Sequence, residues 1–265
     1  MSFWRQKLEF ENIKFEHKNK IAIITLNRPE SLNAMNSDLR LEIVQAMEEV
    51  ENNQDICAVI FTGEGRAFSA GGDIKEQVKV AAMTDKERIA HREKIKKASN
   101  FSWLIANSKK PTIGAINGIA FGGAALLSST FDIRVGSEKT SFRYLAATYG
   151  QANSTWSLPM VVGMAKAKEL MFTGREVKAE EAFQIGLLNH LVAPDEVMPK
   201  SLEIAELIAA GHANMIQGIK TLLHEGTKIG YEDRLHLERD ALGSWMKPVD
   251  PRDGFVDFLS TRKSK

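Results

Sequence analysis

The sequence predicts an α/β fold followed by a helical C-terminal region. In the first half of the chain, short runs of branched apolar residues alternate with longer segments whose apolar residues recur every three or four positions. After about residue 155 only the helical spacing continues. Because strands that are separated by helices require crossover connections, we expect a largely parallel sheet that is covered on both faces.

Four strands are expected in the first half. They span residues 21–26, 57–62, 112–116 and 132–135. The first two are followed by Asn-Arg-Pro and Gly-Glu-Gly, which are typical of turns. The only cysteine, Cys57, lies in the second strand and is interpreted as a small core residue. A single cysteine excludes an internal disulfide and a cysteine-based zinc site.

Helix starts are predicted by capping residues. Ser37 is the expected N-cap of a helix over 37–50, and Thr84 with Glu87 forms a capping box that opens a long charged helix toward Asn107. Further helices are expected near 164–172, 179–185, 196–210, 213–226 and 234–246, followed by an N-cap at Asp250 with Pro251 in the first turn. We divide the chain into a core over 1–195 and a helical oligomerisation region over 196–265.

Composition limits the classes of protein. The chain has 265 residues, of which 43% are hydrophobic, and a formal net charge of +1. This length is enough for a full hydrophobic core. No window approaches ~20 apolar residues, and charged residues interrupt the first 20 positions, so neither a membrane span nor a signal peptide is expected. We therefore predict a cytoplasmic protein whose partners are neither nucleic acid nor membrane.

Two glycine-containing turns are the first candidates for chemistry. Residues 66–75 follow the second expected strand and residues 117–126 follow the third, so both lie at carboxyl ends of parallel strands, where α/β sheets place their ligands. Glycine allows close approach to the backbone, and N–H groups at a helix start favour negative charge. Two such turns side by side would make a two-donor oxyanion hole. Each is alternatively a tight connection from a strand to a helix.

At these turns the sequence resembles the crotonase superfamily, also called the enoyl-CoA hydratase/isomerase family. The matching segments are 26–35, 67–75, 110–123, 131–134, 172–175, 179–182 and 186–187, and they keep the family's order from about residue 10 to 195. The resemblance implies a crotonase-like spiral of ββα turns with a helical C-terminal trimerisation region, assembled as a trimer or a dimer of trimers. It also implies an acyl-CoA thioester substrate, with no cofactor besides the coenzyme A of that substrate.

The resemblance also assigns site residues. It implies that the N–H groups of Gly72 and Gly123 form the oxyanion hole. The implied substrate-binding positions are Ser31, Leu32, Ala70, Asp73, Ile74, Lys75, Leu145 and Ala146. Fixed donors of this kind stabilise the negative charge that a thioester oxygen gains when an enolate forms. Lys75 either approaches the CoA phosphates or is a solvated surface lysine.

The chain departs from the family at the acid–base positions. Hydratases of the family carry one glutamate three residues after the second oxyanion glycine and another in a Pro-Glu pair after the next strand. Here these positions are Leu126 and Ala146. Neither side chain can transfer a proton, whereas hydration needs groups that activate water and deliver a proton. The general acid and base are therefore unassigned.

Other polar residues follow Ala146. Tyr149 could donate a proton, Gln151 could orient water, and Ser154 or Thr155 would need a neighbouring base. Asn153 or Ser154 is alternatively the N-cap of a helix that contains Trp156 and Leu158.

The histidines indicate no metal site, because their spacing matches no metal-binding motif. His91 either reaches the acyl pocket or is solvated on its charged helix.

The sequence thus predicts an acyl-CoA enzyme of the hydratase/isomerase type. The alternatives are another reaction on the same fold, such as decarboxylation or thioester hydrolysis, and acyl-CoA binding without catalysis.

Overall fold

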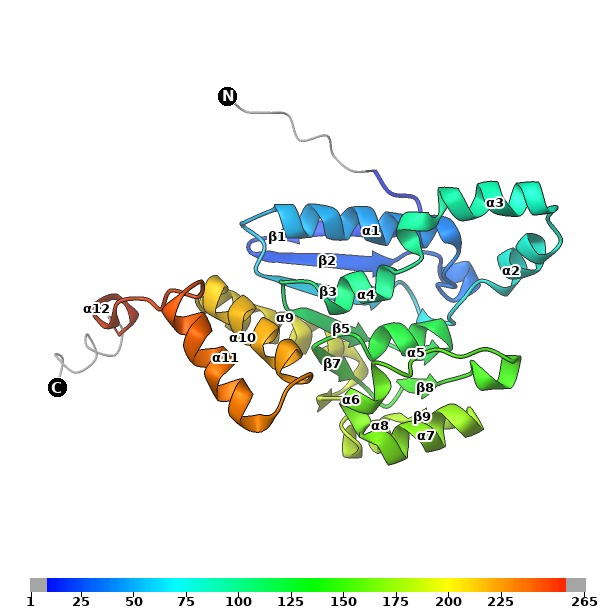
Figure 1. The fold of residues 1–265 in the computed structure, drawn as a ribbon. Coiled ribbons are helices and arrows are strands. Elements are labelled where there is room, and N and C mark those ends of the chain that lie inside the picture. The colour runs from blue at the N-terminus through cyan, green and yellow to red at the C-terminus, as the bar shows by residue number, and fades with distance from the viewer. Residues whose placement is uncertain (1–8, 256–265) are drawn as a thin grey trace, which may run out of the picture. The chain divides into compact units, whose positions relative to one another are not determined.

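The chain forms two compact units that divide after Ala210 in the computed structural model, which describes residues 9–255. The first unit holds all the described strands, and the second consists of helices (Figure 1). The core predicted from the sequence ends at residue 195, whereas the first unit ends at Ala210. The helix over 197–210 therefore belongs to the first unit and not to the predicted oligomerisation region.

A six-stranded sheet forms the centre of the first unit. In spatial order its strands are β1 (Ile13–Lys18), β2 (Ile21–Leu26), β3 (Ala58–Gly63), β5 (Thr112–Ile116), β7 (Ile133–Gly136) and β10 (His190–Leu191). β1 is antiparallel to β2, and the other neighbours are parallel. The four strands expected from the sequence are confirmed as β2, β3, β5 and β7, and the prediction of a largely parallel sheet is also confirmed. The placement of Cys57 in the second strand as a core residue is wrong, because Cys57 precedes β3 and is partly exposed.

A second sheet of four short strands runs beside the first. Its order is β4 (Ala67–Ser69), β6 (Ile119–Phe121), β8 (Ser141–Arg143) and β9 (Glu176–Lys178). The chain alternates between the sheets, because β3 is followed by β4, β5 by β6 and β7 by β8. This alternation confirms the spiral of ββα turns. The prediction that only helices follow residue 155 is wrong, because β9 and β10 add one edge strand to each sheet.

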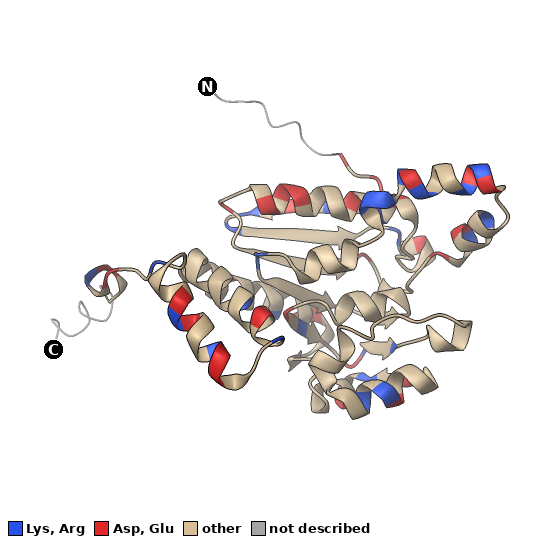
Figure 2. Ribbon diagram, viewed as in Figure 1, with Lys and Arg blue, Asp and Glu red and all other residues tan. Residues whose placement is uncertain are grey.

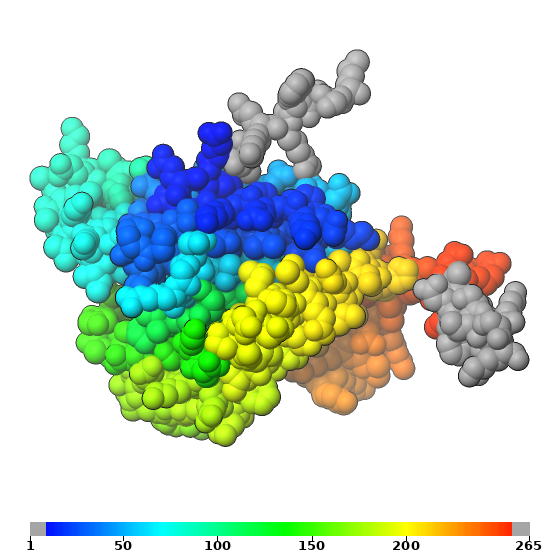
Figure 3. Space-filling model, turned by 180° about the vertical axis from the view of Figure 1, so that it is seen from behind, coloured from blue at the N-terminus to red at the C-terminus, as the bar shows by residue number. Residues whose placement is uncertain are grey.

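Both faces of the large sheet are buried. The helix α1 (Ser37–Asn52) buries Leu39, Ile43 and Met47 in the same core cluster as Ile24 of β2. The opposite face is covered by α9 (Val197–Ala210), which crosses the first unit in Figure 3 (yellow). Since alternate residues of a strand face opposite sides, both sides of β2 and β3 must be apolar.

The helix α1 starts one residue earlier than expected. Asn36 is the N-cap, and its side chain accepts a hydrogen bond from Leu39 N at 2.9 Å. Ser37, the predicted cap, is the first helical residue.

The expected long helix from Thr84 to Asn107 is broken into two. The capping box of Thr84 and Glu87 is confirmed, and it opens α3 (Asp85–Lys94) after α2 (Ile74–Ala81). A 3-10 turn (Lys96–Ala98) then leads into α4 (Phe101–Ala106). Ala98 and Phe101 are buried in the core, whereas α3 carries charges of both signs and has no buried residue (Figure 2). The helix ends before Ala98 because the apolar residues after it pack into the core.

Short helices complete the first unit. They are α5 (Gly123–Ser128), α6 (Leu158–Val162), α7 (Met164–Thr173) and α8 (Ala179–Gln184), with 3-10 helices at Pro29–Ser31, Ala147–Tyr149 and Pro194–Glu196. The predicted N-cap at Asn153 or Ser154 is wrong. α6 begins at Leu158, after Trp156, and Ser154 has a left-handed φ of 61°.

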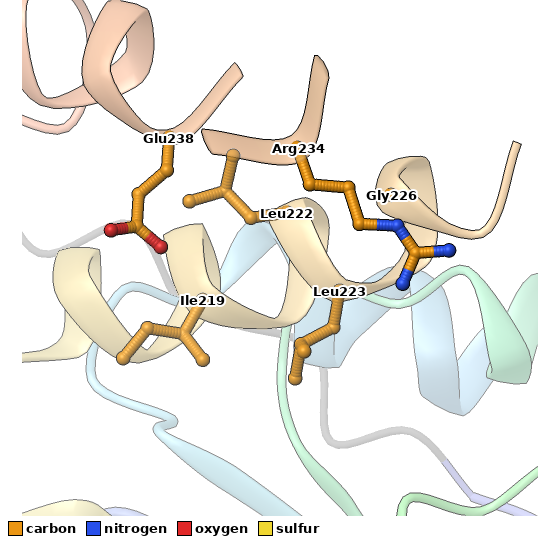
Figure 4. A pocket seen from close by; sticks show the side chains of 6 residues that line it. All are labelled: Ile219, Leu222, Leu223, Gly226, Arg234 and Glu238. Carbon is orange, nitrogen blue, oxygen red and sulfur yellow. The ribbon is translucent and has the colours of Figure 1, made fainter. Parts of the chain in front are cut away.

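The second unit contains α10 (Ala213–Gly226), α11 (Tyr231–Gly243) and α12 (Pro251–Gly254). The predicted N-cap at Asp250 is confirmed, because its side chain accepts from Arg252 N. A hollow between α10 and α11 is lined by Ile219, Leu222, Leu223, Gly226, Arg234 and Glu238 (Figure 4). Among residues 9–255, no helix is long and apolar enough to cross a membrane.

Candidate functional site

The two glycine-containing turns lie side by side at the carboxyl ends of two neighbouring strands of the second sheet. β4 leads into Gly71 and Gly72, its parallel neighbour β6 leads into Gly122 and Gly123, and α5 begins at Gly123. A Cβ added to Gly123 would lie 3.6 Å from the Gly72 nitrogen. The backbone amides that the resemblance implies as oxyanion donors are therefore neighbours in space, although they are 51 positions apart in the sequence.

Neither amide donates a hydrogen bond within the part of the chain that the structure describes. Among the hydrogen bonds of residues 9–255, neither Gly72 N nor Gly123 N donates to an acceptor. Gly72 and Met35 form a parallel β-bridge, but its hydrogen bonds are made by the residues on either side of Gly72. Met35 N donates to Gly71 O at 2.7 Å, and Asp73 N donates to Met35 O at 3.3 Å. Gly123 is the first residue of α5, and the first N–H groups of a helix have no partner inside it. Both N–H groups remain available to an external acceptor.

Gly71 sets how closely the turns approach. Its φ is +96°, which favours glycine, and a Cβ there would lie 2.4 Å from Phe121 O and 3.1 Å from Gly123 N. Only a glycine at this position lets the two turns pack at this distance.

Asp73 fixes the helix that follows the first turn. Its carboxylate caps α2 by accepting from Glu76 N at 3.1 Å, and it accepts from the Arg28 guanidinium at 2.9 Å. Burial favours the neutral acid, but the hydrogen bonds from Glu76 N–H and Arg28 outweigh it and lower the pKa of Asp73 below the ordinary 3.8. The carboxylate is therefore committed to capping and to the ion pair with Arg28.

We expect Asp73→Asn to lower the free energy of unfolding by about 1–2 kcal/mol at pH 7, because asparagine keeps the cap but loses the charged hydrogen bond to Arg28. A carboxyl whose pKa is depressed in the folded state stabilises the protein above its unfolded pKa, and this contribution is lost as the pH falls through the folded pKa. The difference in melting temperature between wild type and variant should therefore shrink below pH 3.8.

The matched control for this prediction is Asp38→Asn, which removes an exposed carboxylate paired with Lys94 at 3.2 Å. Exposed pairs contribute little, so its melting temperature should stay close to that of the wild type. A difference for Asp73→Asn that is equally large at pH 3 and pH 7 would contradict the role of the charge.

Three of the predicted substrate-binding residues, Ser31, Leu32 and Ala70, lie together beside the first turn. Ala70 N donates to Leu32 O at 2.8 Å, and Ser31 Oγ donates to Arg28 O at 3.1 Å. All three predicted residues are partly exposed. Ile74 and Lys75, at the start of α2, are exposed, and 66% of the surface of Ile74 is accessible. This segment is open to a ligand.

The second turn has an apolar neighbour. Leu126 lies one helical turn after Gly123 on α5, is partly exposed, and belongs to a helix without charged residues (Figure 2). Leu145 and Ala146 follow β8, the neighbour of β6, and are also partly exposed. Residues at i and i+3 lie on the same face of a helix, so Leu126 presents an apolar surface beside Gly123.

The other polar residues considered in the sequence differ in exposure and in their contacts. Tyr149 and Gln151 are exposed, and Ser154 is buried with its hydroxyl donating to Asn153 Oδ1 at 3.0 Å. His91 Nε2 lies 3.5 Å from Ser37 Oγ on α1. Among residues 9–255, no three His, Cys, Asp or Glu side chains are grouped as a metal site would require.

Two residues near the glycines were not predicted. Met35 Cε would lie 3.2 Å from a Cβ on Gly123, and Gln77 Nε2 would lie 2.5 Å from a Cβ on Gly72. Side chains on a helix point back toward its N-terminus, so a residue one turn into α2 covers the preceding glycine. With Asp73 recognised as the N-cap of α2, that rule would have predicted that the Gln77 side chain lies over Gly72.

Comparisons with known proteins agree with this arrangement. The family model for enoyl-CoA hydratase/isomerase matches residues 16–265. The chain is 33% identical over 260 residues to the short-chain-enoyl-CoA hydratase of Clostridium acetobutylicum, covering 97% of each chain. It is 33% identical over 261 residues to the crotonyl-CoA hydratase of Syntrophomonas wolfei, covering 97% of this chain and 98% of that protein.

Among solved structures, the crystal structure of the enoyl-CoA hydratase from Bacillus anthracis has a TM-score of 0.85 and 28% identity. The alignment covers 95% of this chain and 97% of that one. The family match spans nearly the whole sequence, and the fold is shared over the same range. The chain therefore belongs to the enoyl-CoA hydratase/isomerase family and is an enzyme of the hydratase/isomerase kind.

Proposed function

We propose that this protein binds acyl-CoA thioesters and stabilises a thioester enolate between the N–H groups of Gly72 and Gly123. The observation that carries this proposal is the pair of neighbouring backbone amides that donate to no acceptor within residues 9–255. Negative charge develops on the thioester oxygen when the enolate forms, and a fixed donor aimed at that oxygen contributes about 3 kcal/mol to the transition state.

The same proposal assigns the CoA-binding residues. Ser31, Leu32 and Ala70 form the adenosine pocket, Asp73 and Ile74 line the pantetheine channel, and Lys75 approaches the phosphates. Leu145 and Ala146 border the acyl group. Partial or full exposure of each residue supports this assignment. Coenzyme A enters as part of the substrate, and the proposed chemistry uses no other cofactor.

The acid–base group is unassigned. Leu126 and Ala146 occupy the positions at which family hydratases carry glutamates. The two acidic residues that follow Gly72 most closely are already engaged. Asp73, the N-cap of α2, binds Arg28, and Glu76 of α2 accepts from Ser37 N at 2.9 Å. This observation favours a second candidate function, in which the oxyanion hole serves decarboxylation, thioester hydrolysis or acyl-CoA binding without turnover.

Assembly and location complete the proposal. We expect a homotrimer or a dimer of trimers in the cytoplasm, built through the helical C-terminal region. Ile219 and Leu223 of α10 and Leu235 of α11 are exposed apolar residues within that region, which supports a role in association. Light scattering on the purified protein measures the number of subunits directly.

Turnover of crotonyl-CoA separates the candidate functions. The purified protein is incubated with crotonyl-CoA, and 3-hydroxybutyryl-CoA is followed by mass spectrometry. Hydration would assign the relatives' reaction to this chain and direct the search for its acid and base to other residues. Unchanged crotonyl-CoA, together with measurable binding of CoA thioesters, would favour the second candidate. Failure to bind any CoA thioester would contradict the proposal itself.

A further inference from the structure

Tyr144 carries a buried hydroxyl that has no hydrogen-bond partner in the described chain. The residue follows β8, is 1% exposed, and its Oη makes no hydrogen bond within residues 9–255. Burial raises the pKa of the phenol well above the ordinary 10.0, and the nearby Arg134 and Ser129 side chains only partly oppose this increase. The hydroxyl therefore keeps its proton at neutral pH. A buried donor in a folded protein is nearly always satisfied by a protein group or by an ordered water.

Two buried serines near the phenol can accept hydrogen bonds but have no proton left to donate. Ser129, the C-cap residue of α5, donates its hydroxyl proton to Leu126 O at 2.7 Å. Ser157, the N-cap residue of α6, lies with its Oγ 2.8 Å from Ser129 Oγ. Because the Ser129 proton is already used, Ser157 is the donor of this pair. Each serine oxygen keeps at least one lone pair for a further donor.

Arg134 limits what can bind between these groups. Its guanidinium is buried, already donates to Leu187 O and Phe131 O, and places a positive charge near the phenol, which disfavours a cation. An anion could accept from Tyr144, but it has no proton for the serine oxygens and would face their lone pairs. A water molecule accepts from the phenol and donates to the serines, so it satisfies both kinds of partner.

From this arrangement we infer that an internal water molecule binds between Tyr144 Oη and the hydroxyl pair of Ser129 and Ser157. Internal waters make about three hydrogen bonds to buried polar groups that would otherwise lack a partner. The three side chains come from the residue after β8, the end of α5 and the start of α6. The water therefore links these three segments directly before Leu145, which belongs to the proposed substrate-binding residues.

A crystal structure of the unliganded wild-type protein, at a resolution that shows ordered waters, tests the site. A water should lie about 2.7–2.8 Å from Tyr144 Oη and within hydrogen-bond distance of Ser129 Oγ or Ser157 Oγ. A direct hydrogen bond from Tyr144 Oη to either serine, with no water between them, would overturn the inference. An ion at this position would overturn it as well.

Melting temperatures give an independent test. Tyr144→Phe removes only the hydroxyl, and the loss of its hydrogen bond to the water should lower the melting temperature by about 2–4 °C. If the hydroxyl had no partner at all, phenylalanine would remove an unsatisfied buried donor, and the melting temperature would stay equal or rise. That result would contradict the water site. The matched control is Tyr231→Phe, since Tyr231 is 92% exposed, and it should stay within about 1 °C of the wild type.

Ser157→Ala tests whether the serine pair shares the water with Tyr144. This variant should lower the melting temperature on its own, because it removes the bond to Ser129 Oγ and an acceptor for the water. In the double variant with Tyr144→Phe, the decrease should be smaller than the sum of the two single decreases, since both substitutions remove bonds in one network. Additive decreases would show that the phenol and the serine pair are not joined by a water and would overturn the inference.

Discussion

Gly123→Val should reduce turnover at least 100-fold, measured as kcat on whichever CoA thioester the wild-type protein converts. A Cβ at this position would already lie 3.2 Å from Met35 Cε and 3.6 Å from the Gly72 nitrogen. The two additional methyl groups of valine would cover the Gly72 N–H or displace the turn. Either change removes a donor from the thioester oxygen.

The fold must survive for this result to be informative. Gly123 has no left-handed φ, so valine is compatible with its backbone, and circular dichroism should show the wild-type helical content. Gly243→Val is the matched control, because a Cβ on this helical glycine meets no atom within 4 Å. Undiminished activity in Gly123→Val would exclude Gly123 as an oxyanion donor.

Gly63→Ala should lower the melting temperature by about 6–12 °C. The Cβ would lie 2.2 Å from Ala67 O and 2.5 Å from Phe68 O, and backbone atoms at such distances cannot move aside independently. Gly63 ends β3 at the point where the chain turns into β4, and Asn117 fixes this turn by donating to Gly63 O at 2.8 Å. Overpacking of this kind costs about 3 kcal/mol, which corresponds to that shift in a domain of this size.

Gly243→Ala again serves as the comparison and should leave the melting temperature within about 1 °C of the wild type, since its Cβ meets no neighbour. Equal melting temperatures for Gly63→Ala and Gly243→Ala would show that the β3–β4 corner relaxes freely.

The long strands could be predicted from sequence because each carries its own signal. β2, β3 and β5 are runs of five or six mostly apolar residues that are buried on both faces. The second sheet has no such signal. β4, β6 and β8 have three residues each, too few for a periodic pattern, and they become strands only because the spiral pairs them with distant segments.

The charged segment from Thr84 to Asn107 shows which part of a helix a local sequence pattern cannot predict. The capping box at Thr84 predicts where α3 begins, and the structure agrees. The end of that helix depends on Ala98 and Phe101, which are buried in the core of the first unit and therefore impose a turn. Helix propensity alone cannot locate this break, because tertiary burial outweighs it.

The candidate site was predictable in part for similar reasons. Glycines after two parallel strands indicate where the backbone is accessible, and the structure brings Gly72 and Gly123 together. Gln77 carries no comparable signal, since a glutamine on an exposed helix is ordinary in any protein. Its position over Gly72 depends on the capping of α2 by Asp73 and on the ion pair of Asp73 with Arg28, which joins segments 45 positions apart.

A crystal structure of the protein with butyryl-CoA bound tests the central claim most directly. The distances from the thioester oxygen to Gly72 N and to Gly123 N should both be about 2.7–3.1 Å. The adenosine group should lie against Ser31, Leu32 and Ala70. A thioester oxygen held by other groups, or a CoA molecule bound only in the hollow between α10 and α11, would contradict the assignment of the oxyanion hole.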